Sequence, residues 1–212
     1  INWKASARRH ELMVNVYQDE RSQQIYNVID KGRVMQQAFR GMTLLDYAIN
    51  ASLVLSYVAM RKEDKAGLVT FDEHFDTFVP ASRQPGYMQT LLENLYSQQT
   101  TFGETDFSAL CVHLNKHVSK RSLLVLYTNF SSIGSMNRQL AYLKQLNHRH
   151  RLLVVFFEDA DLKEYIAQPA KDTEGYYRHV IAEVCLRETA HRIYFEAARD
   201  LFFVDHTGKS FH

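Results

Sequence analysis

A doubly wound α/β fold is predicted by three features of the chain. Four short apolar runs lack alternation between polar and apolar residues, which is typical of parallel strands buried on both faces. Segments with helical patterns separate these runs, and regular exchange of strands and helices favours a doubly wound sheet. The 212 residues, 46% hydrophobic and 23% charged, are sufficient for one buried core. We therefore predict a single domain with helices on both faces of a mostly parallel sheet.

The expected strands can be placed in order along the chain. Residues 25–29, 66–71, 123–127 and 152–157 form the four buried runs, and residues 201–204 are expected to close the sheet. Residues 75–79 follow so soon after residue 71 that a hairpin is expected, which adds one antiparallel edge strand. Residues 12–17 alternate and are a possible edge strand within a lead-in segment, 1–22, that precedes the domain at 23–212.

Helices are expected between the strands, at residues 43–60, 84–96, 106–118, 135–148 and, as a long broken helix, 173–199. The first is expected to begin at Thr43 with Asp46 in the capping-box position. Residues 41–60 are apolar enough to raise the question of a membrane span. Asp46 would be costly at that depth, so a buried helix of the sheet is the favoured interpretation.

Charge and cysteine content exclude several classes of protein. A net charge of +1 gives no general argument for nucleic-acid binding. The two cysteines, Cys111 and Cys185, have no partner at zinc-ligand or disulfide spacing, which favours a reducing, cytoplasmic compartment. Residues 147–151, with two histidines, are interpreted as a basic helix end, and the basic cluster within residues 4–10 as a solvated face. The first residue is Ile1, so we expect part of a longer protein.

Polar residues follow the apolar runs at Asp30, Asp72, Asn129 and the pair 158–159. The carboxyl ends of parallel strands meet at one edge of a sheet, where open α/β folds place their ligand sites. Asp72 and residues 158–159 are interpreted as ordinary polar residues in contact with water. Asp30 differs because a loop with Gly32 and Arg33 follows it directly, and its carboxylate is expected to accept backbone N–H groups of that loop.

Four segments together resemble a known bacterial family. Residues 1–8 read I-N-W-K-A-S-A-R, and they are followed in order by A-G-L-V-T-F at 66–71, G-E-T-D at 103–106 and L-Y-T-N-F at 126–130. This order resembles the family called domain of unknown function 58, and more generally the von Willebrand factor A-like domains. The resemblance implies a three-layer, Rossmann-like von Willebrand A-like fold.

The resemblance also allows a test of metal binding. Von Willebrand A domains hold a metal ion with D-x-S-x-S after the first strand, a Thr from a middle loop and a later Asp. Asp30 and Thr105 match this set as remnant positions, whereas Gly32 and Val34 replace both serines and Asn129 replaces the second Asp. Mg²⁺ requires oxygen ligands in near-octahedral geometry, so no metal is expected.

Two further roles are expected in this loop. The Arg33 guanidinium is expected to pair with Asp30 and take over the charge of the missing cation. Thr105, followed by Asp106, is also a candidate N-cap for the next helix.

The predicted function is that of a non-enzymatic protein-interaction module. Its expected binding surface comprises Asp30, Gly32, Arg33, Thr105 and Asn129. The resemblance implies a parent protein with membrane-spanning segments upstream of this domain. It places the domain on the cytoplasmic side of an inner membrane and implies a MoxR-type AAA+ ATPase as partner, with no nucleic acid and no cofactor.

Two alternatives remain open from the sequence. The first is a ligand-binding module that depends on Mg²⁺ or Mn²⁺. The second is a phosphohydrolase built on Asp30. The chain contains no G-x-S-x-G elbow and no phosphate-binding loop of the G-x-x-x-x-G-K-S/T type, so catalysis has little support.

Overall fold

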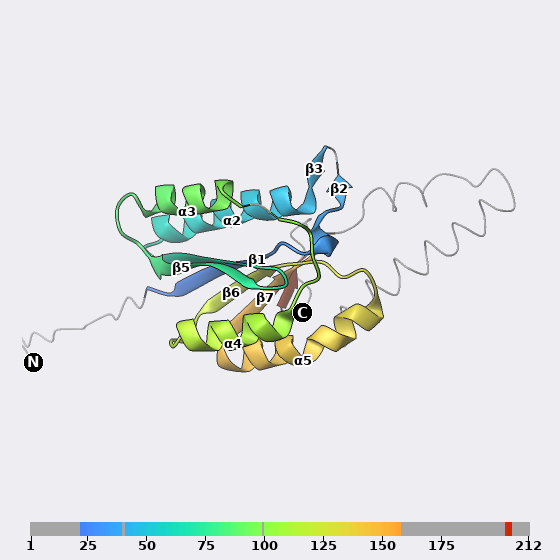
Figure 1. The fold of residues 1–212 in the computed structure, drawn as a ribbon. Coiled ribbons are helices and arrows are strands. Elements are labelled where there is room, and N and C mark those ends of the chain that lie inside the picture. Colours follow the sequence, from blue (N-terminus) through green and yellow to red (C-terminus); the bar gives the residue numbers. More distant parts are fainter. Residues whose placement is uncertain (1–21, 40, 99, 158–201, 205–212) are drawn as a thin grey trace, which may run out of the picture.

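A single twisted sheet forms the centre of the molecule. The computed structural model describes residues 22–39, 41–98, 100–157 and 202–204, and in these the strand order is β5-β4-β1-β6-β7-β8 (Figure 1). Only β5 runs antiparallel to its neighbour, and the other pairs are parallel. This confirms the predicted mostly parallel sheet with one antiparallel edge strand. The bounds are β1 Gln24–Asp30, β4 Lys65–Phe71, β5 Phe75–Ser82, β6 Leu123–Tyr127, β7 Arg151–Val155 and β8 Phe202–Val204.

Helices cover both faces of this sheet. The helices α2 (Leu44–Arg61) and α3 (Tyr87–Tyr96) lie over one face, and α4 (Phe107–His117) and α5 (Ile133–Arg149) lie over the other (Figure 1). The α2 helix starts as predicted, because the Thr43 hydroxyl accepts the N–H of Asp46 and the Asp46 carboxylate accepts the N–H of Thr43. This reciprocal cap satisfies two N–H groups that have no partner within the helix.

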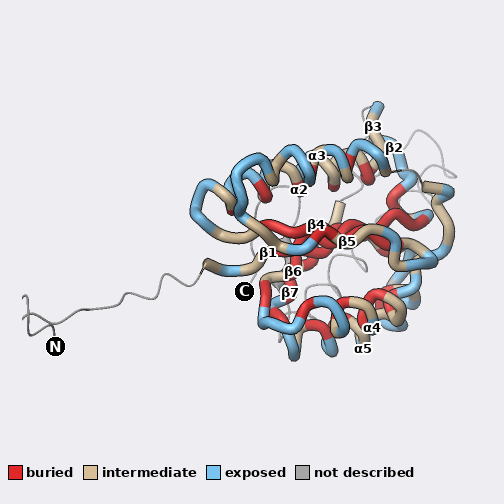
Figure 2. The backbone as a smooth tube through the Cα atoms, turned by 60° about the vertical axis from the view of Figure 1, so that its left-hand side comes forward, coloured by how far each residue is buried: buried red, intermediate tan, exposed pale blue. Residues whose placement is uncertain are grey.

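The strands bury side chains on both faces, as the continuous apolar runs predicted. In β1, Ile25 and Ile29 belong to the core under α2 and α3, while Tyr26 and Val28 belong to the core under α4 and α5. Figure 2 shows the buried backbone concentrated in the sheet between the helical layers. A fully buried aliphatic side chain contributes about 1.5–3 kcal/mol relative to an exposed one, so these two cores hold the layers together.

A polar network crosses the middle of this apolar core. Asn27 is buried in β1, and its amide donates to the hydroxyl of Ser56 at 2.8 Å and to the carbonyl of Ser52 at 3.3 Å. The Tyr127 hydroxyl donates to the Asn27 carbonyl oxygen at 3.3 Å. Since unpaired buried polar groups are costly, this network fixes the position of α2 over β1 and β6.

Parallel register brings the ends of the central strands to one edge. Asp30 pairs with Phe71 of β4, and Ile29 pairs with Tyr127 of β6. Thr128, which follows Tyr127, therefore lies beside Asp30, and Asp72, which follows Phe71, lies beside Lys31 at the carboxyl edge of the sheet. This edge is where the sequence predicted the site.

Several elements differ from prediction. A 3-10 helix, η1 (Arg33–Met35), and a small antiparallel pair, β2 (Ala38–Phe39) with β3 (Met42–Thr43), follow β1, where no such elements were expected. The α3 helix begins at Tyr87 rather than residue 84, because Gly86 before it adopts a left-handed conformation with φ of 81°. The β7 strand ends at Val155, two residues earlier than expected.

The interpretation of residues 147–151 as a basic helix end was only partly right. The α5 helix ends at Arg149, but the His150 side chain after it is fully buried. Burial lowers the pKa of His150, and the charges of Arg149 and Arg121 lower it further.

Other predictions concern residues outside the described part of the chain. These are the lead-in segment with its edge strand at 12–17, the basic cluster at 4–10, the acids at 158–159, the helix at 173–199 and Cys185. Cys111 is a free, buried thiol in α4, as expected. None of the described helices is both long and apolar enough to cross a membrane.

Candidate functional site

Asp30 is the centre of the carboxyl-edge site, and three donors hold its carboxylate. The backbone N–H of Gly32 and the hydroxyl of Thr105 donate to Oδ1 at 2.7 and 2.9 Å. The hydroxyl of Thr128, the residue after β6, donates to Oδ2 at 2.6 Å. The Gly32 contact confirms the expected bond to the backbone of the following loop. The side chain has 0% exposed surface, so it serves as a fixed base under the loops around it.

Burial dominates the titration of this carboxyl group. The pKa of Asp30 is raised to about 6, mainly because removal from water disfavours the charged form. The charge of Asp72 makes a smaller contribution in the same direction. The hydrogen bonds from Thr128, Gly32 and Thr105 act in the opposite direction because they stabilise the carboxylate. Asp30 is therefore a buried acid that titrates close to neutral pH.

Thr105 fills the space beside Gly32. A β-carbon on residue 32 would overlap the Thr105 hydroxyl and would lie 3.0 Å from Oδ1 of Asp30. The glycine thus allows the threonine to reach the buried carboxylate. The role of N-cap expected for Thr105 is instead performed by Asp106, whose Oδ1 accepts the N–H groups of Ser108 and Ala109 at 2.7 and 3.1 Å.

The expected ion pair between Arg33 and Asp30 is not formed. Arg33 instead lies 3.2 Å from the carboxylate of Glu104, with side chains that are 72% and 84% exposed. Arg33 points to solvent because η1 turns away from the end of β1. The buried Asp30 carboxylate accepts its hydrogen bonds from uncharged donors. The Arg33–Glu104 pair therefore forms an exposed rim, and it does not replace a cation.

Asn129 lies at the same edge but its amide is bound to backbone. Its Nδ2 donates to the carbonyl of Phe157 at 3.2 Å, and its Oδ1 accepts the N–H of Phe130 at 2.9 Å. These bonds fix the loop after β6 against the segment after β7. Asn129 is thus a loop-positioning residue of the site.

The oxygens at this edge that could serve as metal ligands are engaged in hydrogen bonds. Both Asp30 oxygens already accept hydrogen bonds, and the carbonyl oxygen of Asn129 is occupied. Gly32 and Val34 supply no side-chain oxygen. Among the described residues no group of three or more His, Cys, Asp or Glu side chains could hold a metal.

Lys31 is a residue of this edge that sequence reasoning missed. Its side chain is buried, and its ammonium lies 2.7 Å from Asp76 and 4.0 Å from Asp72. The Lys31 ammonium, as hydrogen-bond donor, lowers the pKa of Asp76 despite partial burial of that carboxyl. The signal in the sequence was the pair of aspartates, Asp72 and Asp76, around the turn between β4 and β5. The parallel pairing of β1 with β4 places this turn beside residue 31.

The site opens to solvent as a cleft of about 280 Å³. Four of the five predicted surface residues line it, and Gly32 is not among the lining residues. Residues from the loop after β6 and the first turns of α5 complete the wall and were not predicted. They are Ser131, Ser135, Arg138 and Gln139. The cleft is therefore built by three chain segments that meet over the buried Asp30.

The fold and this cleft define a class of protein: a three-layer doubly wound α/β domain with a loop-built site at the carboxyl edge of its sheet. The chain belongs to the family described as protein of unknown function DUF58, whose model matches residues 1–188. This confirms the family resemblance of the sequence. No protein among those with curated descriptions matches the chain.

Solved structures of similar proteins include von Willebrand A domains and membrane-associated bacterial proteins. An aerotolerance-related membrane protein from Bacteroides fragilis NCTC 9343, solved with multiple mutations to serine, is 15% identical, with a TM-score of 0.47, and 63% of this chain and 66% of that one are covered. The conserved hypothetical protein BatB from Bacteroides thetaiotaomicron is 13% identical, with a TM-score of 0.45 and the same coverage.

The SpRpn10 VWA domain is 9% identical, with a TM-score of 0.48, and 76% of this chain and 81% of that one are covered. The chain thus spans just under two thirds of the two Bacteroides proteins, with 66% of each covered.

Proposed function

We propose that this domain is a non-catalytic interaction module that binds a protein partner at the cleft above Asp30. The observation that carries the proposal is the contrast between the buried base of the site and its exposed rim. Asp30 below is fully buried and held by three hydrogen bonds, while Arg33 and Glu104 above are exposed. A rigid base with exposed charges at its rim is suited to recognise a complementary surface.

Burial of Asp30 also argues against the two alternatives. A nucleophilic aspartate must reach its substrate, but this carboxylate has no exposed surface and both its oxygens accept hydrogen bonds. The same bonds leave it poorly placed as a metal ligand. We therefore propose that the site represents a degenerate metal site, in which hydrogen-bond donors from Thr105, Thr128 and Gly32 surround the carboxylate.

The proposed partner is a MoxR-type AAA+ ATPase, which the family resemblance implies. The proposed setting is the cytoplasmic side of a larger protein anchored in an inner membrane by segments upstream of this domain. In this setting the module would act in the assembly or maturation of protein complexes.

The proposal is tested by titrating the purified domain with the MoxR-type ATPase of the same organism. We expect the Arg33→Glu variant to lose at least tenfold in affinity, since it replaces an exposed cation at the rim with a like charge beside Glu104. Lys116→Glu, an exposed change on α4 outside the lining of the cleft, is the matched control and should bind like the wild type. Equal affinity of all three proteins would contradict the proposed surface.

A further inference from the structure

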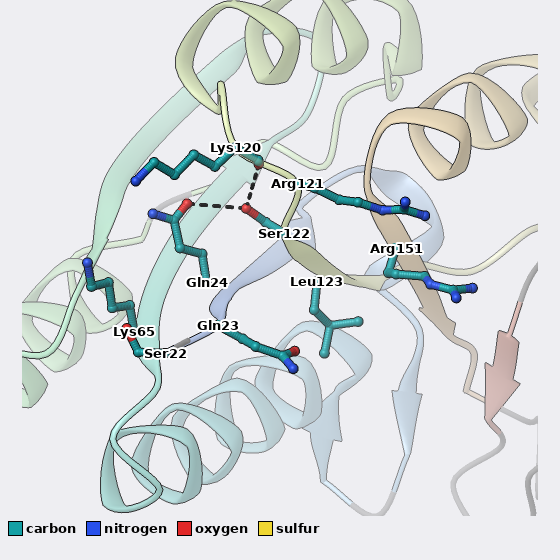
Figure 3. Close-up of a pocket in the computed structure, with 9 residues that line it drawn as sticks. All are labelled: Ser22, Gln23, Gln24, Lys65, Lys120, Arg121, Ser122, Leu123 and Arg151. Carbon is teal, nitrogen blue, oxygen red and sulfur yellow. Dashed lines mark hydrogen bonds between the residues drawn. The ribbon is translucent and has the colours of Figure 1, made fainter. Parts of the chain in front are cut away.

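A second, larger pocket lies at the opposite edge of the sheet from Asp30. Its volume is about 740 Å³, and it is formed where β1, β4, β6 and β7 begin, together with the loop before β6 (Figure 3). Pockets that hold small ligands commonly measure about 300–1,000 Å³, so this one has a suitable size. Its position makes it independent of the cleft described above.

The charged side chains that line this pocket are all positive, and one carboxylate lies next to it, since Asp64 accepts the backbone N–H of Gln23 at 2.8 Å. Lys65, Lys120, Arg121 and Arg151 line it, and no Asp or Glu is among its lining residues. None of the four forms an ion pair with any carboxylate that the structure describes. The whole chain has a net charge of only +1, so positive charge is concentrated here. A concave surface of one sign attracts ligands of the opposite sign.

The donors are arranged on two sides of a polar floor. The Ser122 hydroxyl is within donor distance of two oxygens, Oε1 of the Gln24 side chain at 3.3 Å and the backbone carbonyl of Lys120 at 2.9 Å. Figure 3 shows Lys65 and Lys120 extending to one side of this contact, and Arg121 and Arg151 to the other. The amide nitrogen of Gln24 is turned toward the lysine side. An extended ligand with negative groups at both ends would meet donors at each.

The lining also indicates which anion fits. Leu123 is the only apolar residue among the described residues that line it, and the other eight are polar or charged. Planar guanidinium groups bind phosphate oxygens in pairs, and ammonium groups add charge without directional demands.

We propose that this pocket binds a phosphate-bearing ligand with more than one negative charge. Lys65, Lys120 and Gln24 contact one charged end, and Arg121 and Arg151 contact the other. Such a ligand is either a soluble phosphate compound or the headgroup of an anionic lipid, and the same donors serve both. The proposal does not depend on the function of the carboxyl-edge cleft.

Two binding measurements on the chain distinguish the two sources. One is calorimetric titration with inorganic pyrophosphate, and the other is co-sedimentation with vesicles of phosphatidylglycerol and phosphatidylcholine, compared with phosphatidylcholine alone. We expect saturable binding in at least one of them, with affinity falling as salt increases. Binding of pyrophosphate alone identifies a soluble ligand, and binding of the anionic vesicles alone identifies a headgroup.

The variants place the binding at the pocket. Arg121→Gln combined with Arg151→Gln is expected to weaken binding at least tenfold, and Lys65→Gln alone by a smaller factor. Lys116→Gln combined with Lys144→Gln removes the same charge from exposed helix positions and should change affinity less than twofold. The proposal is overturned if neither probe binds, if the control pair weakens binding equally, or if a hexaglutamate peptide binds as tightly as pyrophosphate. Circular dichroism confirms that each variant is folded.

Discussion

The Thr105 hydroxyl occupies the space that a β-carbon on residue 32 would need, and the two residues are therefore fitted to one another. Gly32 has a φ of −72°, which any residue can adopt, so its lack of a side chain matters here for space and not for backbone conformation. The space allows Thr105 to reach the buried carboxylate of Asp30. The glycine at residue 32 and the hydrogen bond from Thr105 are thus one structural feature.

Gly32→Ala should force Thr105 away from Asp30 and reduce the free energy of unfolding by about 1–3 kcal/mol, as overpacking commonly does. Urea unfolding measures the change. Gly134→Ala is the matched control, because its β-carbon would have only Ser132 nearby, at 3.8 Å, in the first turn of α5. In a Thr105→Ala background the cost of Gly32→Ala should fall to less than half. An equal cost in both backgrounds would show that the two side chains do not compete.

Asp30→Asn should stabilise the protein at neutral pH. Burial raises the pKa of Asp30 from its usual value of 3.8 to about 6 in the folded state, so the folded protein binds the proton more tightly than the unfolded chain. The charged form then costs about 3 kcal/mol at pH 7.5, and this cost disappears as the pH falls from about 6 to 4.

The measurement is the free energy of unfolding of wild type and Asp30→Asn from pH 4 to pH 7.5. The variant should be more stable by about 1–3 kcal/mol at pH 7.5, and the difference should vanish near pH 4. A variant that is less stable than the wild type at pH 7.5 would mean that the hydrogen bonds to the carboxylate outweigh its burial.

The ion pair between the buried Lys31 ammonium and the half-exposed Asp76 should respond unequally to loss of either partner. Asp76→Ala leaves the ammonium with the more distant Asp72, at 4.0 Å, and should cost about 1–3 kcal/mol in unfolding free energy. Lys31→Met keeps the volume and removes the buried charge, so it should cost less than about 1 kcal/mol. Chemical denaturation at pH 7 compares the two. A larger loss for Lys31→Met would contradict this account.

The pH dependence of this pair has the opposite sign to that of Asp30. Lys31 holds the pKa of Asp76 below its usual value of 3.8. The contribution of Asp76 is therefore present above pH 3.8 and is lost as the pH falls through its lower folded value. The difference in stability between wild type and Asp76→Ala should accordingly shrink below pH 3.8.

Divalent metal should leave the protein unchanged. Because the oxygens of Asp30 and Asn129 are engaged in hydrogen bonds, millimolar Mg²⁺ or Mn²⁺ is expected to give no saturable heat in calorimetry and no rise in melting temperature. Saturable heat with a rise in melting temperature, both absent in Asp30→Asn, would restore the metal-dependent alternative.

The layers and the alternation of strands and helices along the chain could be predicted because they depend on local patterns, whereas the order of the strands within the sheet was not predicted. Continuous apolar runs mark strands buried on both faces, and the three residues between β4 and β5 permit only a hairpin. The capping box of α2 could be predicted for the same reason, since Thr43 and Asp46 lie within one helical turn. That Gly32 and Val34 lack side-chain oxygens could likewise be read directly.

The partners within the site could not be predicted, because they depend on which loops meet in space. Arg33 adjoins the strand end in sequence, but η1 directs it toward Glu104. Thr128 bonds Asp30 across 98 residues of sequence separation. Lys31 looked like an ordinary loop lysine, and only the hairpin after β4 supplies its carboxylates. Proximity in sequence therefore suggested the wrong partner for Asp30.

The proposed recognition of a protein partner at the Arg33–Glu104 rim is tested most directly by an exchange of the two charges. Arg33→Glu combined with Glu104→Arg restores an ion pair while reversing both charges that a partner would meet. We expect this double variant to keep the wild-type melting temperature and to lose at least tenfold in affinity for the MoxR-type ATPase. Wild-type affinity in the exchanged protein would contradict recognition at this rim.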